Sequence, residues 1–221
     1  MNVVPTKLRY FRDRGVQLRG VIHVGMSWGE EIADYLHLGA SNVIGFEPLP
    51  EAFNEAVKLY GEDNRVILVN AGLGDTSEKM TIRKIEDPNP MVGHPVGTGG
   101  SSFLLDVHPL PPDCTVSPLT VPVYRFEDWF RNATAHVPHP GDEMKKYNAL
   151  VIDVQGFEMN VLRGFGDLLG YIDVANIECS RTPVYHGEVP AETIVKFMRD
   201  HGFEQMTPIE DHNDILFQRL P

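Results

Sequence analysis

The sequence predicts an α/β fold built on a doubly wound, mostly parallel sheet. Three observations support this class: short apolar runs recur along the chain, stretches with helical spacing of apolar residues lie between them, and glycine or proline stands at many junctions. In residues 1–85 the elements alternate as strand, helix, strand, helix, strand, an order typical of parallel sheets. The 221 residues suit a single domain, which we expect to span 1–221 with a lid or ligand-binding insertion at about 86–146.

The first zone, residues 1–85, supplies most of this alternation. Gly39 ends the helix over 26–38, and the helix over Pro50–Tyr60 has its apolar residues on one face. The expected elements are a short basic helix at about Thr6–Arg14, a strand at Val21–Gly25, a helix at 26–38, a strand at Asn42–Pro48, a helix at Pro50–Tyr60, a strand at Arg65–Asp75 that runs into a turn, and a half-exposed strand at Met80–Ile85.

The second zone, residues 86–146, is dense in proline and glycine. A compact domain rarely carries so long an irregular stretch unless it is a lid or a binding loop. Within it we expect a strand at Thr120–Phe126, a short helix at 126–133 and a further loop at His136–Asp142.

The third zone, residues 147–221, returns to the α/β pattern. Ala149–Gly156 is a strong apolar strand, and the helix after it has apolar residues on one face. The expected elements are strands at Ala149–Gly156 and Tyr171–Ser180, helices at 157–169 and Pro190–His201, and a terminal antiparallel pair at 203–209 and 214–220.

Composition and charge exclude several classes of protein. The net charge of −12 argues against a mainly electrostatic nucleic-acid binder and against docking on an anionic membrane. No apolar run approaches the roughly 20 residues of a membrane span, and the N-terminus has no continuous apolar segment of a secretory signal. Cys114 and Cys179 cannot form a disulfide scaffold, so a reducing cytoplasm is the expected compartment.

The loop after the first strand is a candidate ligand loop. Gly25 and Gly29 would let the backbone approach a ligand, and the helix that follows would offer free amides. Their GxxxG spacing differs from the GxGxxG pattern that a dinucleotide favours, and it suits a ligand without phosphate, such as S-adenosylmethionine. The alternative is a plain turn between strand and helix.

Glu47 strengthens the assignment of a nucleoside ligand. It ends the second strand, 22 positions after Gly25, where a carboxylate can accept hydrogen bonds from both ribose hydroxyls. Pro48 fixes the turn that follows. The residues expected beside the adenine are Asn70, Ala71 and Gly72. A solvated glutamate at the strand end is the alternative, and Asp75 is equally well a turn residue.

Two carboxylates of the third zone stand out. Asp153 and Glu178 occupy equivalent places in two apolar strands, where a charge needs a partner, a metal or a catalytic role. In a doubly wound sheet, ligands bind outside the C-terminal strand ends, where Glu47 would join them. Two carboxylates with a third polar ligand suit Mg²⁺, and the candidates for that ligand are Gln155, Asn176 and Asp214. A carboxylate that accepts loop amides, or one that acts directly as a base, is the alternative.

The order of these motifs resembles that of the FkbM-type methyltransferases, which use S-adenosylmethionine. The resemblance covers roughly Val21 to Arg219, and it is specific because the first and later motifs occur together. The matching stretches are VIHVGMSWGEE, VIGFEPLPEAF, VNAGLGD, GGSSFLL, VIDVQGFEMNVLRGF, NIECSRTPVYHG, the helix that ends in HGF, and DILFQR.

The chain departs from the commonest form of that family at two motifs. The family usually has Asp at the position of His23, and a Lys-x-Asp-x-Glu-Gly stretch where this chain has Val151, Asp153 and Gln155. The departures resemble one branch, with His in the first motif, Asp-x-Gln-Gly in the later one, and a Ser-Ser run followed by a His. The residues that fit this branch are Ser101, Ser102 and His108.

The resemblance implies a Rossmann-like class I methyltransferase fold, with a seven-stranded sheet, a C-terminal antiparallel hairpin and S-adenosylmethionine over the Gly25 loop. It also implies methyl transfer to a hydroxyl of a small molecule, such as a sugar, an oligosaccharide or a glycosylated natural product. With the loop residues, it gives this cofactor-binding set: His23, Gly25, Met26, Ser27, Glu47, Pro48, Ala71, Gly72, Asp75 and Asp153.

O-methylation needs a group that holds the acceptor hydroxyl near the methyl group and one that removes its proton. Mg²⁺ on Asp153, Glu178 and Asp214 would lower the pKa of that hydroxyl. A histidine would then take the proton, because imidazole ordinarily titrates near neutral pH. The expected catalytic residues are Asp153, His108 and His186.

The other histidines are weaker candidates for the catalytic base. His23 lies within a strand beside the cofactor loop, so a buried, hydrogen-bonded role that shapes the site is favoured over that of a base. His94 and His212 are weaker candidates for the base. No paired HxxxH or HxH spacing supports zinc.

Two rival functions remain open. An NAD-type oxidoreductase would need the GxGxxG loop that this chain lacks. A catalytically degenerate binding module on the same fold is a rival of another class, suggested by His23 and Gln155. The expected partner is a small-molecule hydroxyl acceptor, with neither nucleic acid nor membrane, and the proline-rich loops would suit a homodimer.

Overall fold

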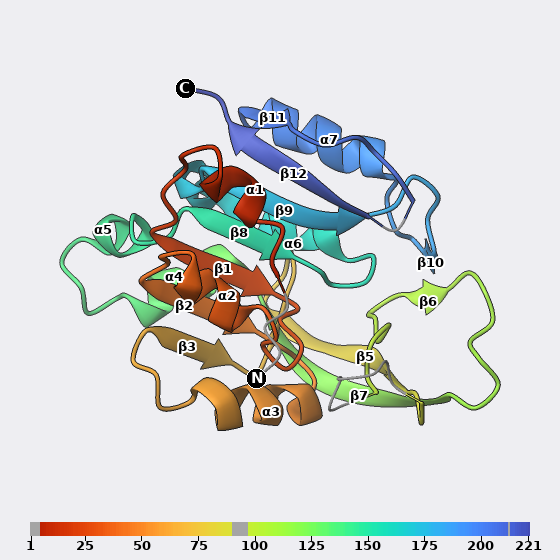
Figure 1. The fold of residues 1–221 in the computed structure, drawn as a ribbon. Helices are drawn as coiled ribbons and strands as arrows, with labels where there is room; N and C mark the ends of the chain where they lie inside the picture. Colours follow the sequence, from red (N-terminus) through yellow and green to blue (C-terminus); the bar gives the residue numbers. More distant parts are fainter. Residues whose placement is uncertain (1–4, 90–96, 212) are drawn as a thin grey trace.

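The computed structural model describes residues 5–89, 97–211 and 213–221. Its centre is a seven-stranded sheet in the order β11-β12-β9-β8-β1-β2-β3 (Figure 1). The strands are β1 (Gly20–Val24), β2 (Asn42–Phe46), β3 (Val66–Val69), β8 (Ala149–Ile152), β9 (Val174–Cys179), β11 (Phe203–Gln205) and β12 (Asn213–Arg219). The strands from β3 to β9 run parallel, whereas β12 is antiparallel to β9 and to β11. The predicted doubly wound sheet with its C-terminal hairpin is confirmed.

The central strands are apolar because both of their faces are covered. Every residue of β1 and of β8 is buried, as expected for strands in the middle of a parallel sheet. His23 is the one polar side chain of β1, and it lies opposite Gly45 in β2 and Val151 in β8. The glycine leaves room for the thioether of Met26, which a Cβ atom at position 45 would overlap.

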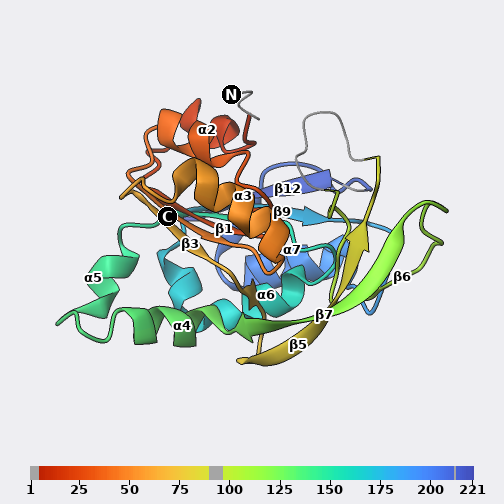
Figure 2. The same cartoon turned by 90° about the horizontal axis from the view of Figure 1, so that it is seen from below.

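Helices cover the two faces of the sheet, as Figure 2 shows. One face carries α1 (Arg9–Arg12), α2 (Ile32–His37) and α3 (Pro50–Tyr60). The other carries α4 (Phe126–Ala133), α6 (Glu158–Phe165) and α7 (Ala191–Asp200). Successive strand residues alternate between the two cores: Val21 and Val43 pack on the first face, Ile22 and Ile44 on the second.

The middle zone is more regular than the sequence predicted. The strand expected at Thr120–Phe126 is a ten-residue strand, β7 (Thr115–Tyr124), that pairs with β5 (Glu78–Glu86) over nine residue pairs. β4 (Gly72–Leu73) joins the other edge of β7, which gives a second, three-stranded sheet. It packs on the N-terminal end of α3 through a small apolar cluster: Leu49, Ala52, Ile82, Val121 and Val123. The strand expected at Arg65–Asp75 therefore breaks at Asn70 and serves both sheets.

Several element boundaries differ from those expected. The helix expected at 26–38 begins at Ile32, because residues 26–31 form the loop of the site. The helix expected at 157–169 ends at Phe165, and Gly166, at φ 53°, starts a 3₁₀ turn, η1 (Gly166–Tyr171). The loop expected at His136–Asp142 contains the start of α5 (Pro140–Met144). The predicted strand at 203–209 is regular only as β11.

No helix in the described ranges is long and apolar enough to cross a membrane. Two short strands complete the fold: β6 (Leu105–Asp106) from the middle zone pairs with β10 (Tyr185–His186), which follows β9. This pairing brings the middle zone close to the edge of the main sheet at which its parallel strands end.

Candidate functional site

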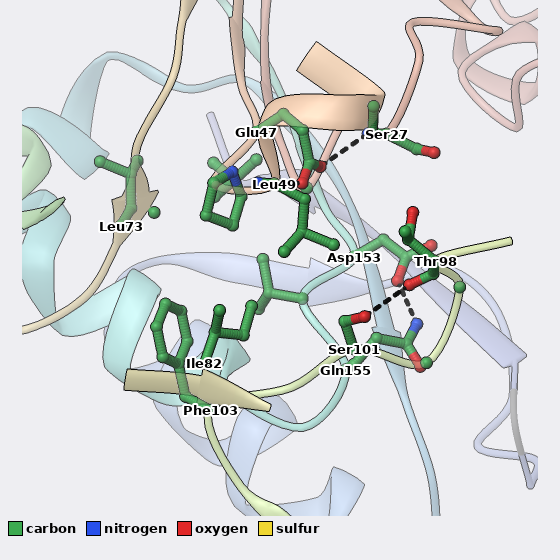
Figure 3. A pocket seen from close by; sticks show the side chains of 18 of the residues that line it. Ser27, Glu47, Leu49, Leu73, Ile82, Thr98, Ser101, Phe103, Asp153 and Gln155 are labelled. Atoms are coloured by element: carbon green, nitrogen blue, oxygen red, sulfur yellow. Dashed lines mark hydrogen bonds between the residues drawn. The ribbon is translucent and has the colours of Figure 1, made fainter. Parts of the chain in front are cut away.

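The candidate site is a pocket at the C-terminal ends of β1, β2 and β8, closed on one side by the middle zone (Figure 3). Its position is the one at which doubly wound sheets bind ligands. Of the ten residues expected to bind a cofactor, those that line the pocket are Gly25, Ser27, Glu47, Pro48, Ala71, Gly72 and Asp153.

The loop after β1 is shaped by Gly25. This residue has φ +80°, and a Cβ atom on it would overlap the carbonyl oxygen of Asp153, so no other residue fits there without a shift of the backbone. The N–H groups of Gly25 and Met26 both donate to the carbonyl of Phe46, at 3.0 and 3.1 Å. The loop is thereby tied to the ends of both neighbouring strands.

Glu47 forms a fixed acidic wall of the pocket. It is buried, and its two carboxylate oxygens accept backbone N–H donors from Ser27 (3.0 Å) and Leu49 (2.8 Å), the first of which Figure 3 shows. Burial raises the pKa of Glu47 to about 8. The side chain therefore has a fixed place at the end of β2.

Glu30 is a second acid of the pocket, and the sequence reasoning did not single it out. In the described part of the chain, its buried Oε2 atom has no hydrogen-bond partner. Burial raises the pKa of Glu30 to about 7. A buried acceptor without a donor is costly, so this oxygen suits a donor group of a ligand.

The second sheet and the middle zone supply the opposite wall. Ile82 of β5 and Phe103 lie across from Glu47 in Figure 3, and Ser101 donates to the carbonyl of Thr98 at 2.7 Å. The sequence predicted a lid or binding loop in this zone and singled out Ser101, but it did not identify Ile82 or Phe103, since their approach depends on how β5 and β7 pair.

Gln155 connects the pocket to a second one. Its Nε2 donates to Asp153 Oδ1 (2.7 Å) and to Glu178 Oε2 (2.9 Å), and its Oε1 accepts the hydroxyl of Tyr185 (2.8 Å). Its backbone carbonyl accepts the hydroxyl of Ser102 (2.7 Å). Gln155 itself has φ 57°, a left-handed conformation unusual outside glycine. The side chain thus links the ends of β8 and β9 to Tyr185 in β10, and the backbone carbonyl links the same loop to the middle zone.

The expected magnesium ligands do not assemble into a metal site. The Gln155 amide nitrogen lies between Asp153 and Glu178, where a cation would have to lie, and Asp214 pairs with Lys7 at 2.6 Å. No group of three or more His, Cys, Asp or Glu side chains in the described ranges could hold a metal ion. Burial, and next the charge of Asp153, raise the pKa of Glu178 to about 10. This donor set does not fit Mg²⁺.

Three of the expected cofactor residues lie behind the pocket instead. His23 is buried, its Nδ1 lies 2.9 Å from the Tyr35 hydroxyl, and burial lowers its pKa to about 4, so the imidazole is neutral. Met26 packs its thioether against Gly45. Asp75 accepts a hydrogen bond from Asn160 at 3.1 Å. These side chains support the pocket walls from outside.

The two candidate bases differ in position. His108 lines the second pocket, together with Gln155, Glu178 and Tyr185. His186 lies in β10 and lines only a shallow neighbouring groove that His108 shares. His94 and His212 lie outside the described residues.

Glu158 is a functional candidate that the sequence reasoning missed. It is buried at the start of α6, where its Oε1 accepts N–H donors from Gly156 (3.0 Å) and Val154 (3.3 Å). Burial raises its pKa to about 8. The signal in the sequence was an acid two positions after the glycine of the later motif.

Comparisons with known proteins give a family and a fold. A sequence model described as "Methyltransferase FkbM domain" matches residues 23–204. The structure of the methyltransferase FkbM from Methylobacillus flagellatus aligns with a TM-score of 0.55 at 14% identity, over 97% of this chain and 48% of that one. The chain thus spans about half the length of that relative.

Two other alignments have lower TM-scores. The N-methyltransferase NodS from Bradyrhizobium japonicum aligns at 0.48 with 7% identity, over 97% of this chain and 93% of that one. A putative RNA methyltransferase from Pyrococcus horikoshii aligns at 0.46 with 15% identity, over 97% and 81%. A comparison with curated proteins finds no match.

Proposed function

The chain belongs to the FkbM methyltransferase domain family, and from this membership we propose that it transfers a methyl group from S-adenosylmethionine to a hydroxyl of a small molecule. The observation that supports the cofactor assignment best is a pair of acids in the pocket under the Gly25 loop: Glu47, which is buried, and Glu30, whose Oε2 atom is buried. Two backbone amides hold Glu47, and that oxygen of Glu30 has no donor among the described residues.

The pocket residues suit each polar part of this cofactor. Glu47 would accept hydrogen bonds from the two ribose hydroxyls. Ala71 and Gly72 would border the adenine, since they follow the end of β3 and carry little side chain. The partnerless Oε2 of Glu30 would accept the ammonium group of the methionine part. These roles assign a cofactor contact to three residues of the set expected from the sequence and add Glu30 to that set.

The proposed chemistry is a direct displacement. When bound, S-adenosylmethionine supplies an electrophilic methyl group. The remaining tasks for the protein are to orient the acceptor hydroxyl and to accept its proton. We assign proton acceptance to His108, because it lines the pocket next to Gln155, whereas His186 lines only the adjoining groove. Asp153, on the cofactor side of Gln155, would orient the reacting groups.

A metal-assisted route is not part of this proposal. The amide of Gln155 holds Asp153 and Glu178 by hydrogen bonds, and Lys7 neutralises Asp214. Proton removal by a side chain therefore replaces the metal in the mechanism. The acceptor class that the resemblance implies, a sugar or a glycosylated natural product, stays a proposal, as does a homodimer.

The test is a calorimetric titration with S-adenosylmethionine, once in Mg²⁺ and once in EDTA. We expect saturable one-site binding that is the same in both. A change in affinity on addition of EDTA would contradict the metal-free site, and absence of binding would contradict the cofactor assignment. Binding without turnover on any hydroxyl compound would support the rival of a degenerate binding module.

A further inference from the structure

A second pocket adjoins the cofactor pocket on the far side of Gln155. It is lined by β6 and the segment after it, by the end of β9 and by the segment around β10. The lining residues that matter for its chemistry are Asp106, His108, Leu110, Glu178, Tyr185 and Glu188. We name this cavity the acceptor pocket.

Gln155 is the wall common to the two pockets. Its amide group contacts Asp153 on the cofactor side and Glu178 on the other, and it accepts the Tyr185 hydroxyl as well. The two pockets therefore adjoin at this side chain. Methyl transfer requires the reacting atoms to approach to about 3 Å, so the Gln155 side chain would have to turn aside when the acceptor binds.

The acceptor pocket is acidic. Four carboxyl groups line it, from Asp106, Glu158, Glu178 and Glu188, and no lysine or arginine is among the lining residues. Arg83 pairs with Asp106 at 2.6 Å from outside this pocket, and burial keeps Glu158 and Glu178 largely protonated at neutral pH, so the charge that an acceptor would face is mainly that of Glu188. A phosphate or carboxylate on the acceptor would be repelled, whereas an ammonium group would find acceptors on several sides.

The remaining walls of the acceptor pocket are apolar. Tyr185 is largely buried, and Leu110 lines the pocket together with its neighbours Pro109 and Pro111. Apolar and aromatic walls with a few polar groups are typical of small-molecule sites, and aromatic rings suit the carbon face of a sugar. The pocket thus combines an apolar surface with a cluster of acids.

We propose that the acceptor of methyl transfer is a hydroxyl compound that carries an ammonium group, of the amino-sugar type, and that it binds in the acceptor pocket. This inference rests on the function proposed above. In the transfer, the acceptor oxygen gains the methyl group as the bond from sulfur to that carbon breaks, and the hydroxyl proton passes to His108. S-adenosylhomocysteine leaves as the other product.

Three methyl glycosides with the same ring test this proposal: the 2-amino-2-deoxyglucoside, the glucoside and the glucuronide. Each is titrated by calorimetry into protein already saturated with S-adenosylhomocysteine. We expect the amine to bind at least tenfold more tightly than the neutral sugar, and the glucuronide to show no binding. The preceding titration with S-adenosylhomocysteine reports on the cofactor site separately.

Variants test whether the preference for the amine over the neutral sugar arises in the acceptor pocket. Glu188→Gln should reduce the advantage of the amine over the neutral sugar about fivefold, because it removes a charge that the ammonium faces. Glu192→Gln, on the exposed side of α7, is the matched control and should leave it unchanged. Equal or tighter binding of either other glycoside, or no binding of the amine, would overturn the proposal even if the cofactor binds normally. The wild-type comparison holds even if Glu188→Gln fails to fold.

Discussion

At the scale of single residues, the site depends on carboxyl groups that burial holds in unusual protonation states. Glu47 is the clearest case, because each of its oxygens accepts a backbone amide and its pKa is about 8. The sequence located Glu47 by its distance from the glycine loop. It could not predict Glu30, since nothing in the local sequence shows that one of its oxygens finds no donor in the described part of the chain.

Replacement of Glu47 by glutamine should weaken binding of S-adenosylmethionine about 10- to 100-fold. The physical reason is the loss of a charged acceptor for two hydroxyls, worth about 1.5–3 kcal/mol. Calorimetric titration measures the effect, with Glu62→Gln in the exposed loop after α3 as the control. An unchanged affinity in Glu47→Gln would remove this residue from the cofactor site.

The affinity for S-adenosylmethionine should also depend on pH. Glu47 must ionise to accept two hydroxyls, so affinity should rise from pH 6.5 to about 8 and then level off, by up to about tenfold per pH unit. His23 does not contribute to this slope, because burial lowers its pKa to about 4. Titrations across this range check the prediction, and the slope should shrink in Glu47→Gln. A flat profile in the wild type would contradict it.

At the scale of secondary-structure elements, the strands and helices of the main sheet were predictable from apolar runs and helical spacing. The second sheet was not, although both of its long strands were noticed. β5 and β7 are joined by about thirty residues of chain, and local pattern does not show which strands pair over such a distance. The acceptor pocket was missed for the same reason, since it depends on the pairing of β6 with β10.

The turn between β1 and α2 gives an element-scale prediction. Gly25→Ala should lower the free energy of unfolding by more than about 3 kcal/mol and abolish cofactor binding, because the new methyl group would overlap the carbonyl of Asp153. Gly39→Ala is a matched control: it also has positive φ, +104°, but nothing lies within 4 Å of the added atom. It should cost only about 1–2 kcal/mol, from the backbone conformation alone.

Urea unfolding of both glycine variants, followed by titration with cofactor, measures the difference. Equal losses in Gly25→Ala and Gly39→Ala would mean that the close approach of β1 and β8 contributes nothing beyond backbone conformation. A stable Gly25→Ala that still binds S-adenosylmethionine would contradict the place of the loop in the pocket.

At the scale of the whole molecule, the buried acids make stability depend on pH. Burial raises the pKa values of Glu30 to about 7, of Glu47 and Glu158 to about 8, and of Glu178 to about 10, whereas all are ionised in the unfolded chain above pH 6. The folded state therefore binds more protons than the unfolded state. Its stability is greatest at low pH with respect to these groups, and it declines as pH rises through their folded-state pKa values.

We expect the free energy of unfolding, without cofactor, to fall by about 1 kcal/mol or more per pH unit between pH 6.5 and 8. His23 acts in the opposite sense up to about pH 7, where its unfolded-state imidazole loses its proton, so it offsets only a small part of the slope at the lower end of this window. Urea titrations at several pH values provide the measurement. Glu158→Gln should flatten the slope, and a stability that rises with pH in the wild type would contradict the assignment.

The two non-glycine residues with positive φ in the described ranges, Ser27 and Gln155, both line the cofactor pocket. Each holds a left-handed conformation that costs an ordinary side chain about 1–2 kcal/mol. Glycine at position 155 would relieve this strain, but it would also deprive Glu178 and Tyr185 of a hydrogen-bond partner, which costs about 1–3 kcal/mol for each group. The side chain thus offsets the strain of its own backbone. Directed evolution for heat resistance and selection for turnover should therefore both keep glutamine at this position.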